Sequence, residues 1–296
     1  MHIGLSIPLP AYTIDPAFMA KTAEALGYAS IWYAEHPVVP VESSSPFPST
    51  GGEIPLTYSH FDEPYIALAR ASAVTTTLQL GTGVTLVPER NPLVLAKAVA
   101  SLDLHSKGRF QFGIGTGWLR EETEIMGGDF PRRWTQTREA LEVMKLLWTQ
   151  DEAEYNGRYF DFPKVRCYPK PMQKPYPPIL IGGMAPNVLQ RIVDHADGWL
   201  PNRLTPEQLR QSRKELSQRA EEAGRDPDSL SIMIYGQLPD RALVESLFEA
   251  GADGVIVRPQ RHEDNEDAMA EQLNDIAQAV LCPAPRVKPQ ELSHES

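Results

Sequence analysis

The sequence predicts a single (β/α)8 barrel, an α/β fold in which parallel strands alternate with helices. Two observations favour it. Short apolar segments alternate with helix-like segments along the chain, and the length of 296 residues suits a barrel with insertions. A doubly wound open sheet is the structural alternative. The eight expected strands are Ile3–Ile7, Ser30–Ala34, Leu78–Leu86, the apolar part of Gly108–Trp118, Ile179–Gly183, Ala196–Leu200, Leu230–Tyr235 and Asp253–Val257.

The helices between these strands are marked by capping residues. Asp15-Pro16 opens the first helix and Gly27 ends it, since an acid before proline suits a helix start and glycine a helix end. Glu63-Pro64 and Asn91-Pro92 predict the next two helix starts. Later helices are expected around residues 140–148, 205–223 and 243–250.

Two insertions interrupt the repeat. Val38–Phe61, after the second strand, is rich in Pro, Ser and Gly, which is typical of a binding loop or lid. Glu154–Phe160 predicts a hairpin around an Asn-Gly turn before the fifth strand. We expect one domain over residues 1–281 and a poorly ordered tail over residues 282–296.

Composition argues against several classes of partner and site. A net charge of −11 argues against nucleic acid or anionic membrane as a partner, because both attract basic surfaces. Cys167 and Cys282 lie far apart and predict neither a disulfide framework nor a zinc site. The N-terminal residues lack signal-peptide features and no apolar run is long enough to span a bilayer, so we expect a cytoplasmic protein without membrane association.

Candidate binding residues cluster where the expected strands end, at the face of a barrel that carries function. Three of these ends contain glycines, in Gly81-Thr82-Gly83-Val84, Gly115-Thr116-Gly117 and Gly182-Gly183-Met184. Glycine allows backbone to approach a flat or phosphorylated ligand closely. The alternative for each is a glycine required by packing or by a turn.

Acid–base candidates are few. His36 follows Glu35 at a strand end, where an imidazole could move a proton near neutral pH. Glu121 and Glu122 follow the Gly115–Gly117 turn, and we interpret Glu122 as an acid in the first turn of a helix that offsets the helix dipole. The chain lacks the His-Glu-x-x-His zinc motif, the Walker lysine motif and the Gly-x-Ser-x-Gly elbow, so no metal site is expected.

In combination, these stretches resemble the bacterial luciferase-like flavin and deazaflavin oxidoreductase superfamily, and most closely its branch labelled as F420-dependent. The resemblance runs from Ile3 to about Val257. The stretches that carry it are Leu80-Gly81-Thr82-Gly83-Val84, Asn91-Pro92-Leu93, Gly108–Glu122, Tyr168-Pro169-Lys170-Pro171, Ile181-Gly182-Gly183 and Asp197-Gly198-Trp199-Leu200.

The resemblance implies particular site residues. A cis peptide is expected at Gly83–Val84, and His36 is expected near the reactive ring carbon as a catalytic residue together with Glu35. Glu35 departs from the more frequent Asp of the family at that position. Arg120, Arg132 or Arg133 could attract an acidic cofactor tail, or could be solvated surface charges. The implied cofactor-binding residues are Ser6, Thr82, Gly83, Val84, Gly115, Thr116, Gly117, Glu121, Gly182, Gly183 and Met184.

The implied activity is hydride transfer between coenzyme F420, a deazaflavin, and a small organic substrate. One alternative is an FMN-dependent monooxygenase supplied with reduced flavin by a partner reductase. A second is a non-catalytic flavin-binding protein. A homodimer is also implied, and an F420 or flavin reductase is a possible redox partner. In each case Phe47, Tyr58 and Phe61 of the insertion would shape an apolar substrate pocket.

Overall fold

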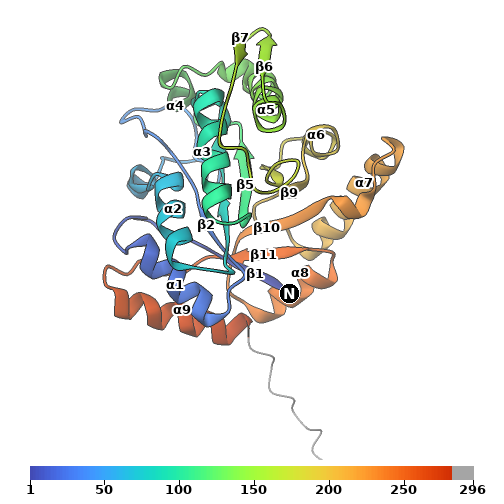
Figure 1. The fold of residues 1–296 in the computed structure, drawn as a ribbon. Coiled ribbons are helices and arrows are strands. Elements are labelled where there is room, and N and C mark those ends of the chain that lie inside the picture. The colour runs from blue at the N-terminus through green and yellow to red at the C-terminus, as the bar shows by residue number, and fades with distance from the viewer. Residues whose placement is uncertain (282–296) are drawn as a thin grey trace, which may run out of the picture.

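The computed structural model describes residues 1–281 and shows a closed parallel barrel surrounded by helices (Figure 1). Neighbouring strands follow one another from β1 through β2, β3 and β4, β5, β8, β9, β10 and β11, and β11 pairs with β1. This last pairing closes the sheet, so the (β/α)8 prediction is confirmed and the open-sheet alternative is wrong. The tail expected over residues 282–296 lies outside the described residues.

All eight predicted strand positions are present. The third position is divided in two, because the ladder is interrupted at Gly83 and Val84. The barrel strands are β1 (His2–Ser6), β2 (Ser30–Tyr33), β3 (Gln79–Thr82), β4 (Thr85–Leu86), β5 (Phe110–Gly115), β8 (Ile179–Gly182), β9 (Gly198–Leu200), β10 (Ser231–Gln237) and β11 (Gly254–Val257).

Most helices begin at the positions that were predicted from capping residues. Asp15 accepts a hydrogen bond from the Ala17 N–H, Asn91 caps α3, and Thr205 with Gln208 forms a reciprocal capping box on α7. The helices are α1 (Pro16–Leu26), α2 (Pro64–Val74), α3 (Pro92–His105), α4 (Arg120–Ile125), α5 (Arg133–Thr149), α6 (Val188–His195), α7 (Pro206–Glu222), α8 (Arg241–Glu249) and α9 (Glu266–Val280). Among residues 1–281, none of the helices is long and apolar enough to cross a bilayer.

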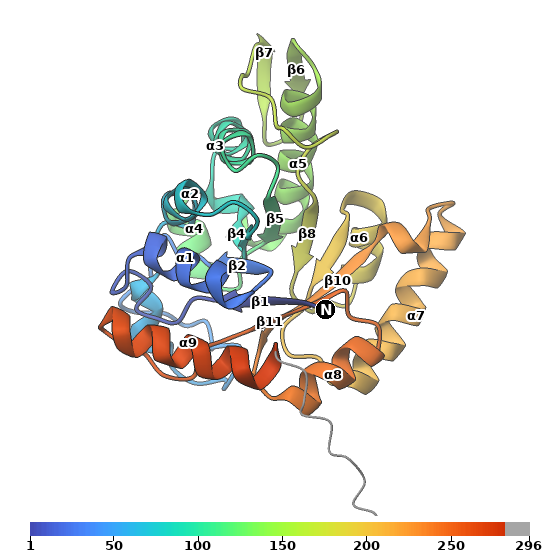
Figure 2. The ribbon, with the colours of Figure 1, turned by 60° about the horizontal axis from the view of Figure 1, so that its bottom comes forward.

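Both insertions occur at the positions predicted from the sequence. The antiparallel hairpin of β6 (Ala153–Asn156) and β7 (Asp161–Val165) projects from the barrel beside α5 (Figure 2). Its turn spans residues 157–160, with the Gly157 N–H donating to the Phe160 carbonyl, so it is longer than the Asn-Gly turn predicted. The loop after β2 contains one 3-10 helix, Leu56–His60.

Large side chains fill the interior of the barrel. Trp32, Leu180, Leu200, Met233 and Ile256 form one buried cluster, with Val84 and Tyr235 packed against it. A Cβ on Gly81 would lie 2.2 Å from the Trp32 ring. The packing alternative therefore holds for Gly81, and the barrel is closed to ligands below its strand ends.

Candidate active site

A cavity of about 310 Å³ lies at the C-terminal ends of the barrel strands. Eight predicted cofactor residues line it: Gly83, Val84, Gly115, Thr116, Gly117, Gly182, Gly183 and Met184. A larger groove of about 690 Å³ lies outside the barrel between α1, α2 and α3, but its lining is almost wholly apolar. We place the active site in the smaller cavity, because polar backbone and side chains converge there at the functional end of a barrel.

Two of the glycine-containing strand ends make room for a valine of the third. A Cβ on Gly115 would lie 2.6 Å from Val84 Cγ2, and a Cβ on Gly182 would lie 2.7 Å from Val84 Cγ1. The Gly83–Val84 peptide is cis, as the resemblance implies. Strand ends far apart in the sequence thus fit around the Val84 side chain, which forms an apolar wall of the cavity.

The part of the cavity lined by Gly183 and Arg191 suits an anionic group. Gly183 has φ +89°, and a Cβ there would meet nothing within 4 Å, so its backbone borders open space. Arg191 also lines the cavity, with its guanidinium 4.4 Å from the centre of the Trp134 ring. An exposed glycine backbone beside a guanidinium matches the chemistry that binds phosphate.

Several lining residues were missed by the sequence analysis. Some lie in helices, and the others lie in the barrel strands or shortly after a strand end, with no local pattern to mark them. They are Leu86, Ile114, Trp118, Trp134, Thr137, Ile181, Ala185, Val188, Arg191, Leu200, Asn202 and Tyr235.

His36 forms a buried pair with Glu122. His36 Nδ1 lies 2.6 Å from Glu122 Oε2, and the side chains are 7% and 0% exposed. Glu122 lies in the first turn of α4, as predicted, but its side chain also binds His36, which the sequence did not indicate. Because a carboxylate only accepts, we assign the proton in this bond to Nδ1, which leaves Nε2 as the second functional nitrogen.

Aromatic rings enclose the His36 imidazole. The centres of the Tyr58, Phe61 and Trp118 rings lie 5.5, 5.2 and 5.7 Å from that of the imidazole. Phe47 packs against Tyr58 and Trp118, so the three aromatic residues expected from the insertion gather here. Trp118 also lines the cavity, and it joins the cavity to the His36–Glu122 pair.

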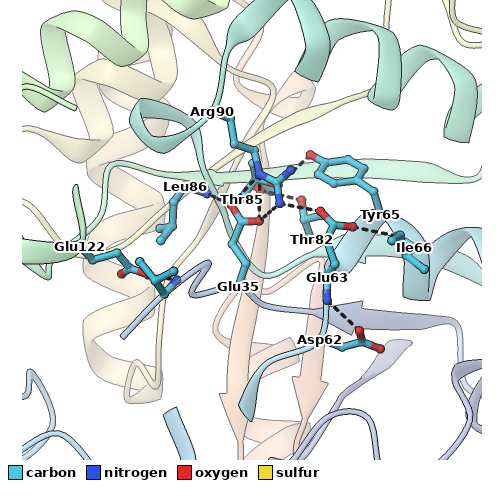
Figure 3. A network of polar contacts seen from close by, with 12 residues as sticks. Glu35, Asp62, Glu63, Tyr65, Ile66, Thr82, Thr85, Leu86, Arg90 and Glu122 are labelled. Atoms are coloured by element: carbon cyan, nitrogen blue, oxygen red, sulfur yellow. Dashed lines mark hydrogen bonds and ion pairs between the residues drawn. The ribbon is translucent and has the colours of Figure 1, made fainter. Parts of the chain in front are cut away.

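Glu35 points into a different network, shown in Figure 3. Its carboxylate accepts from the Leu86 N–H at 2.6 Å and from Arg90, which also contacts Glu63. Burial raises the pKa of Glu35, whereas the Arg90 guanidinium and the Leu86 N–H act in the opposite direction. Neither Glu35 nor His36 is among the residues that line the cavity. Glu35 contacts the backbone of the lining residue Leu86, and His36 contacts the ring of the lining residue Trp118. Because Leu86 and Arg90 already bind the Glu35 carboxylate, we interpret Glu35 as a structural residue and not as the catalytic residue expected.

Three predicted cofactor residues also lie away from the cavity lining. Ser6 donates to the Val257 carbonyl, and the buried Thr82 hydroxyl donates to the Gly113 carbonyl at 2.7 Å. Glu121 holds the insertion, accepting hydrogen bonds from the Ser44 N–H and from the hydroxyls of Ser44 and Ser45. The hydrogen bonds of these side chains stabilise the barrel and the insertion after β2.

The arginines considered for an acidic cofactor tail have partners of their own. Arg120 pairs with Glu124 and Arg132 lies near Asp129. Arg133 donates to the Gly117 carbonyl at 3.0 Å and stacks on the Phe130 ring. Only Arg133 touches the cavity wall, and it does so through a backbone carbonyl.

Glu89 is a further buried acid beside the site. Its Oε1 accepts from the Thr123 hydroxyl at 2.9 Å, whereas its buried Oε2 has no hydrogen-bond partner. Burial, together with the negative charge of Glu122, raises the pKa of Glu89 to about 8. Glu89 is thus mostly protonated at neutral pH. It lies near Glu122, the residue that pairs with His36.

Comparisons with known proteins show which family this chain resembles. A family profile described as luciferase-like monooxygenase matches residues 17–239. An uncharacterised protein of Mycobacterium tuberculosis is 39% identical over 204 residues, which cover 68% of this chain and 72% of the relative. The F420-dependent glucose-6-phosphate dehydrogenase of Amycolatopsis mediterranei is 28% identical over 270 residues, which cover 86% of this chain and 75% of that enzyme.

A solved structure shows the same fold. The oxygenating constituent of 3,6-diketocamphane monooxygenase from Pseudomonas putida, in complex with FMN, superposes with a TM-score of 0.72 at 17% identity. The superposition covers 95% of this chain and 97% of that one. The relatives of this chain thus include an F420-dependent enzyme, and its fold is shared with an FMN-containing oxygenase. From the profile match and the 39% identical relative, this chain belongs to the luciferase-like monooxygenase family.

Proposed function

We propose that this protein is an oxidoreductase that transfers a hydride between coenzyme F420 and a small organic substrate. The observation that carries the proposal is the His36–Glu122 pair, whose 2.6 Å contact lies beside a cavity of about 310 Å³. Hydride transfer at a carbon bonded to oxygen also requires a proton to move at that oxygen. A histidine oriented by a carboxylate supplies such an acid–base group.

The cavity has features that fit the cofactor. F420, when bound, would supply two-electron hydride chemistry at one ring carbon. Val84 offers an apolar contact to a flat ring, and the backbone of residues 115–117 borders the space for a polar chain. Gly183 and Arg191 would hold its phosphate.

The protein would contribute orientation, proton transfer and exclusion of water. Glu122 would hold the His36 ring through Nδ1, and Nε2 would accept the proton of a substrate hydroxyl or return it in the reverse direction. Tyr58, Phe61 and Trp118 would keep bulk water from the imidazole.

The choice of F420 rests on relatives and not on residue chemistry. The F420-dependent relative aligns over 86% of this chain, which supports F420 over FMN. An FMN-dependent monooxygenase with a partner reductase is the alternative, favoured by the fold shared with an FMN-containing oxygenase. A homodimer is part of the proposal and rests on the resemblance alone.

Parallel titrations of the purified protein with F420 and with FMN test the proposal. Fluorescence or calorimetry should show tight F420 binding and weaker FMN binding. Tight FMN binding with weak F420 binding would instead support the monooxygenase. Binding of neither would contradict the assignment of the cavity. Normal cofactor binding without turnover in the wild-type protein would favour a non-catalytic flavin-binding protein.

A further inference from the structure

A buried tryptophan behind the cavity is hydrogen-bonded to one of the residues that line it. Trp199 Nε1 donates to the Gly183 carbonyl at 2.9 Å, and Trp199 is only 2% exposed. Gly183 belongs to the cavity lining, whereas Trp199 does not. The indole therefore acts on the cavity through the Gly183 backbone.

The position of Trp199 in β9 determines the direction of this hydrogen bond. Leu200, the next residue of β9, belongs to the cluster inside the barrel. Because successive side chains of a strand alternate between its two faces, Trp199 faces outward, toward the helices. It shares a buried cluster there with Ile192 of α6. The Gly183 carbonyl is thus directed toward the outer layer of the fold.

This hydrogen bond also orients the N–H group that follows. The peptide between Gly183 and Met184 is trans, and the C=O and N–H of a trans peptide point in opposite directions. The Met184 N–H therefore points away from Trp199. Within residues 1–281, the N–H groups of Met184 and Ala185 donate to no protein acceptor, and both residues line the cavity.

Two further features of this part of the cavity suit a phosphate group. Gly183 has φ +89°, a conformation that glycine adopts readily. Arg191 also lines the cavity, and its guanidinium stacks on the Trp134 ring and forms no ion pair with any residue that the structure describes. Backbone N–H groups beside a guanidinium are the donors from which phosphate oxygens accept hydrogen bonds.

We propose that Trp199 is a positioning residue that makes the cavity select phosphorylated cofactors over their unphosphorylated forms. Its indole N–H holds the Gly183 peptide, and this keeps the Met184 N–H available to the phosphate beside Arg191. Without that hydrogen bond the peptide would be free to rotate, because glycine allows either orientation. The identity of the cofactor rests on the proposed function, whereas the phosphate site is testable with inorganic phosphate alone.

The experiment compares the full-length protein with its Trp199→Phe variant, which keeps an aromatic ring and removes the N–H donor. Calorimetry would measure the affinity for inorganic phosphate, for F420, and for FMN and riboflavin, which differ only in the phosphate. We expect Trp199→Phe to weaken the binding of the three phosphate-containing ligands at least tenfold. The affinity for riboflavin should change by less than about twofold, because riboflavin has no phosphate for these N–H groups to bind.

Trp148→Phe is the matched control. Trp148 is also 2% exposed, and its indole N–H donates to the Ala96 carbonyl at 2.9 Å, between α5 and α3. Neither residue lines the cavity, so this variant loses the same kind of hydrogen bond and should bind every ligand like wild type. Thermal unfolding would show that both variants are folded.

A measurement on the wild-type protein requires no variant. In ¹⁵N NMR spectra, inorganic phosphate should shift the Met184 amide and the Trp199 indole N–H. The Trp148 indole N–H should not move.

Three results would overturn the proposal. They are the absence of saturable phosphate binding and of NMR shifts in wild type, unchanged affinity for phosphate-containing ligands in Trp199→Phe, or equal losses for FMN and riboflavin in that variant. The last result would show a general disturbance of the cavity. Phosphate binding that Trp199→Phe weakens, without binding of F420 or FMN, would support the role of Trp199 and contradict the proposed function. Tight F420 binding that Trp199→Phe leaves unchanged would contradict only the role of Trp199.

Discussion

Glu35 and His36 are adjacent in the sequence, yet they belong to two regions with different properties. Glu35 meets the Arg90 guanidinium and a backbone N–H, and Arg90 continues to Glu63 (Figure 3). His36 meets one carboxylate, that of Glu122, and aromatic rings cover the rest of its surroundings. The Glu35 region connects β2 to β4 and α2, and the His36 region reaches the cavity through Trp118.

The two side chains differ in the hydrogen-bonding capacity that remains free for a substrate. The Glu35 carboxylate is already bound by a permanent cation, so it has little capacity for a substrate. His36 uses only Nδ1 in its contact with Glu122, which leaves Nε2 for the proton transfer that we propose. Burial alone therefore does not identify a catalytic residue, and we propose His36 because its imidazole also contacts Trp118, a residue of the cavity lining.

Replacing His36 should have the largest effect on activity and little effect on cofactor binding. In His36→Asn, the loss of acid–base catalysis should lower turnover by about 10²–10⁴-fold. Steady-state kinetics with an accepted substrate and a cofactor titration would measure both quantities. Glu35→Gln is the comparison variant, and its turnover per folded molecule should fall much less. Unchanged turnover in His36→Asn would remove His36 from the mechanism.

Replacing Arg90 should have the largest effect on stability. Arg90→Met leaves Glu35 buried without its cation, which should lower the free energy of unfolding by about 3–5 kcal/mol. Urea unfolding would measure the change. Arg120→Met, which removes an exposed pair with Glu124, should cost no more than about 1 kcal/mol. Equal effects of the two substitutions would contradict the structural role of the Glu35 network.

These two regions show what the sequence could predict. The barrel was predictable because strands and helix caps are local signals, as at Asp15-Pro16 and Thr205. The strand-end glycines were predictable as a cavity, since parallel strands end on one face. His36 was a candidate acid–base residue because it follows Glu35 at a strand end, and the family resemblance strengthened that hypothesis.

The partners of these residues were not predictable in the same way. Glu122 lies 86 residues from His36, and its position in the first turn of α4 also suited an acid that offsets the helix dipole. Glu35 and Arg90 are 55 residues apart. Such pairs depend on how loops and short helices pack above the barrel, and a single sequence carries no periodic signal for that packing.

Glu89 provides a third buried carboxyl, one with neither a cation nor a histidine as a hydrogen-bond partner. Its pKa is raised to about 8 in the folded protein, from 4.5. Between these values the unfolded chain releases a proton that the folded chain retains, so stability should fall as pH rises from about 4.5 to 8.

Glu89→Gln should remove this component of the pH dependence and stabilise the protein by on the order of 2–4 kcal/mol at pH 8 relative to wild type. Urea unfolding at pH 5, 6.5 and 8 would test it. Glu139→Gln, at another buried acid whose Oε1 accepts backbone N–H bonds, serves as a control that should not be stabilised. Parallel pH profiles for wild type and Glu89→Gln would show that Glu89 ionises normally.

The glycines around Val84 should have smaller effects. Gly182→Ala would place a Cβ 2.7 Å from Val84 and should cost about 1–3 kcal/mol of stability through overpacking, with weaker cofactor binding. Gly183→Ala meets open space and should cost only about 1–2 kcal/mol, for its left-handed backbone. Thermal unfolding and cofactor titration would compare them. Loss of cofactor affinity only in Gly183→Ala would argue against Val84 as a cavity wall.

The most direct test of the division between Glu35 and His36 is a side-chain ¹⁵N NMR titration with F420. Binding of the cofactor should shift the ring nitrogens of His36 and leave the Nε–H signal of Arg90 unchanged. Shifts at Arg90 with no change at His36 would contradict the account, because they would place the cofactor beside the network that we describe as structural.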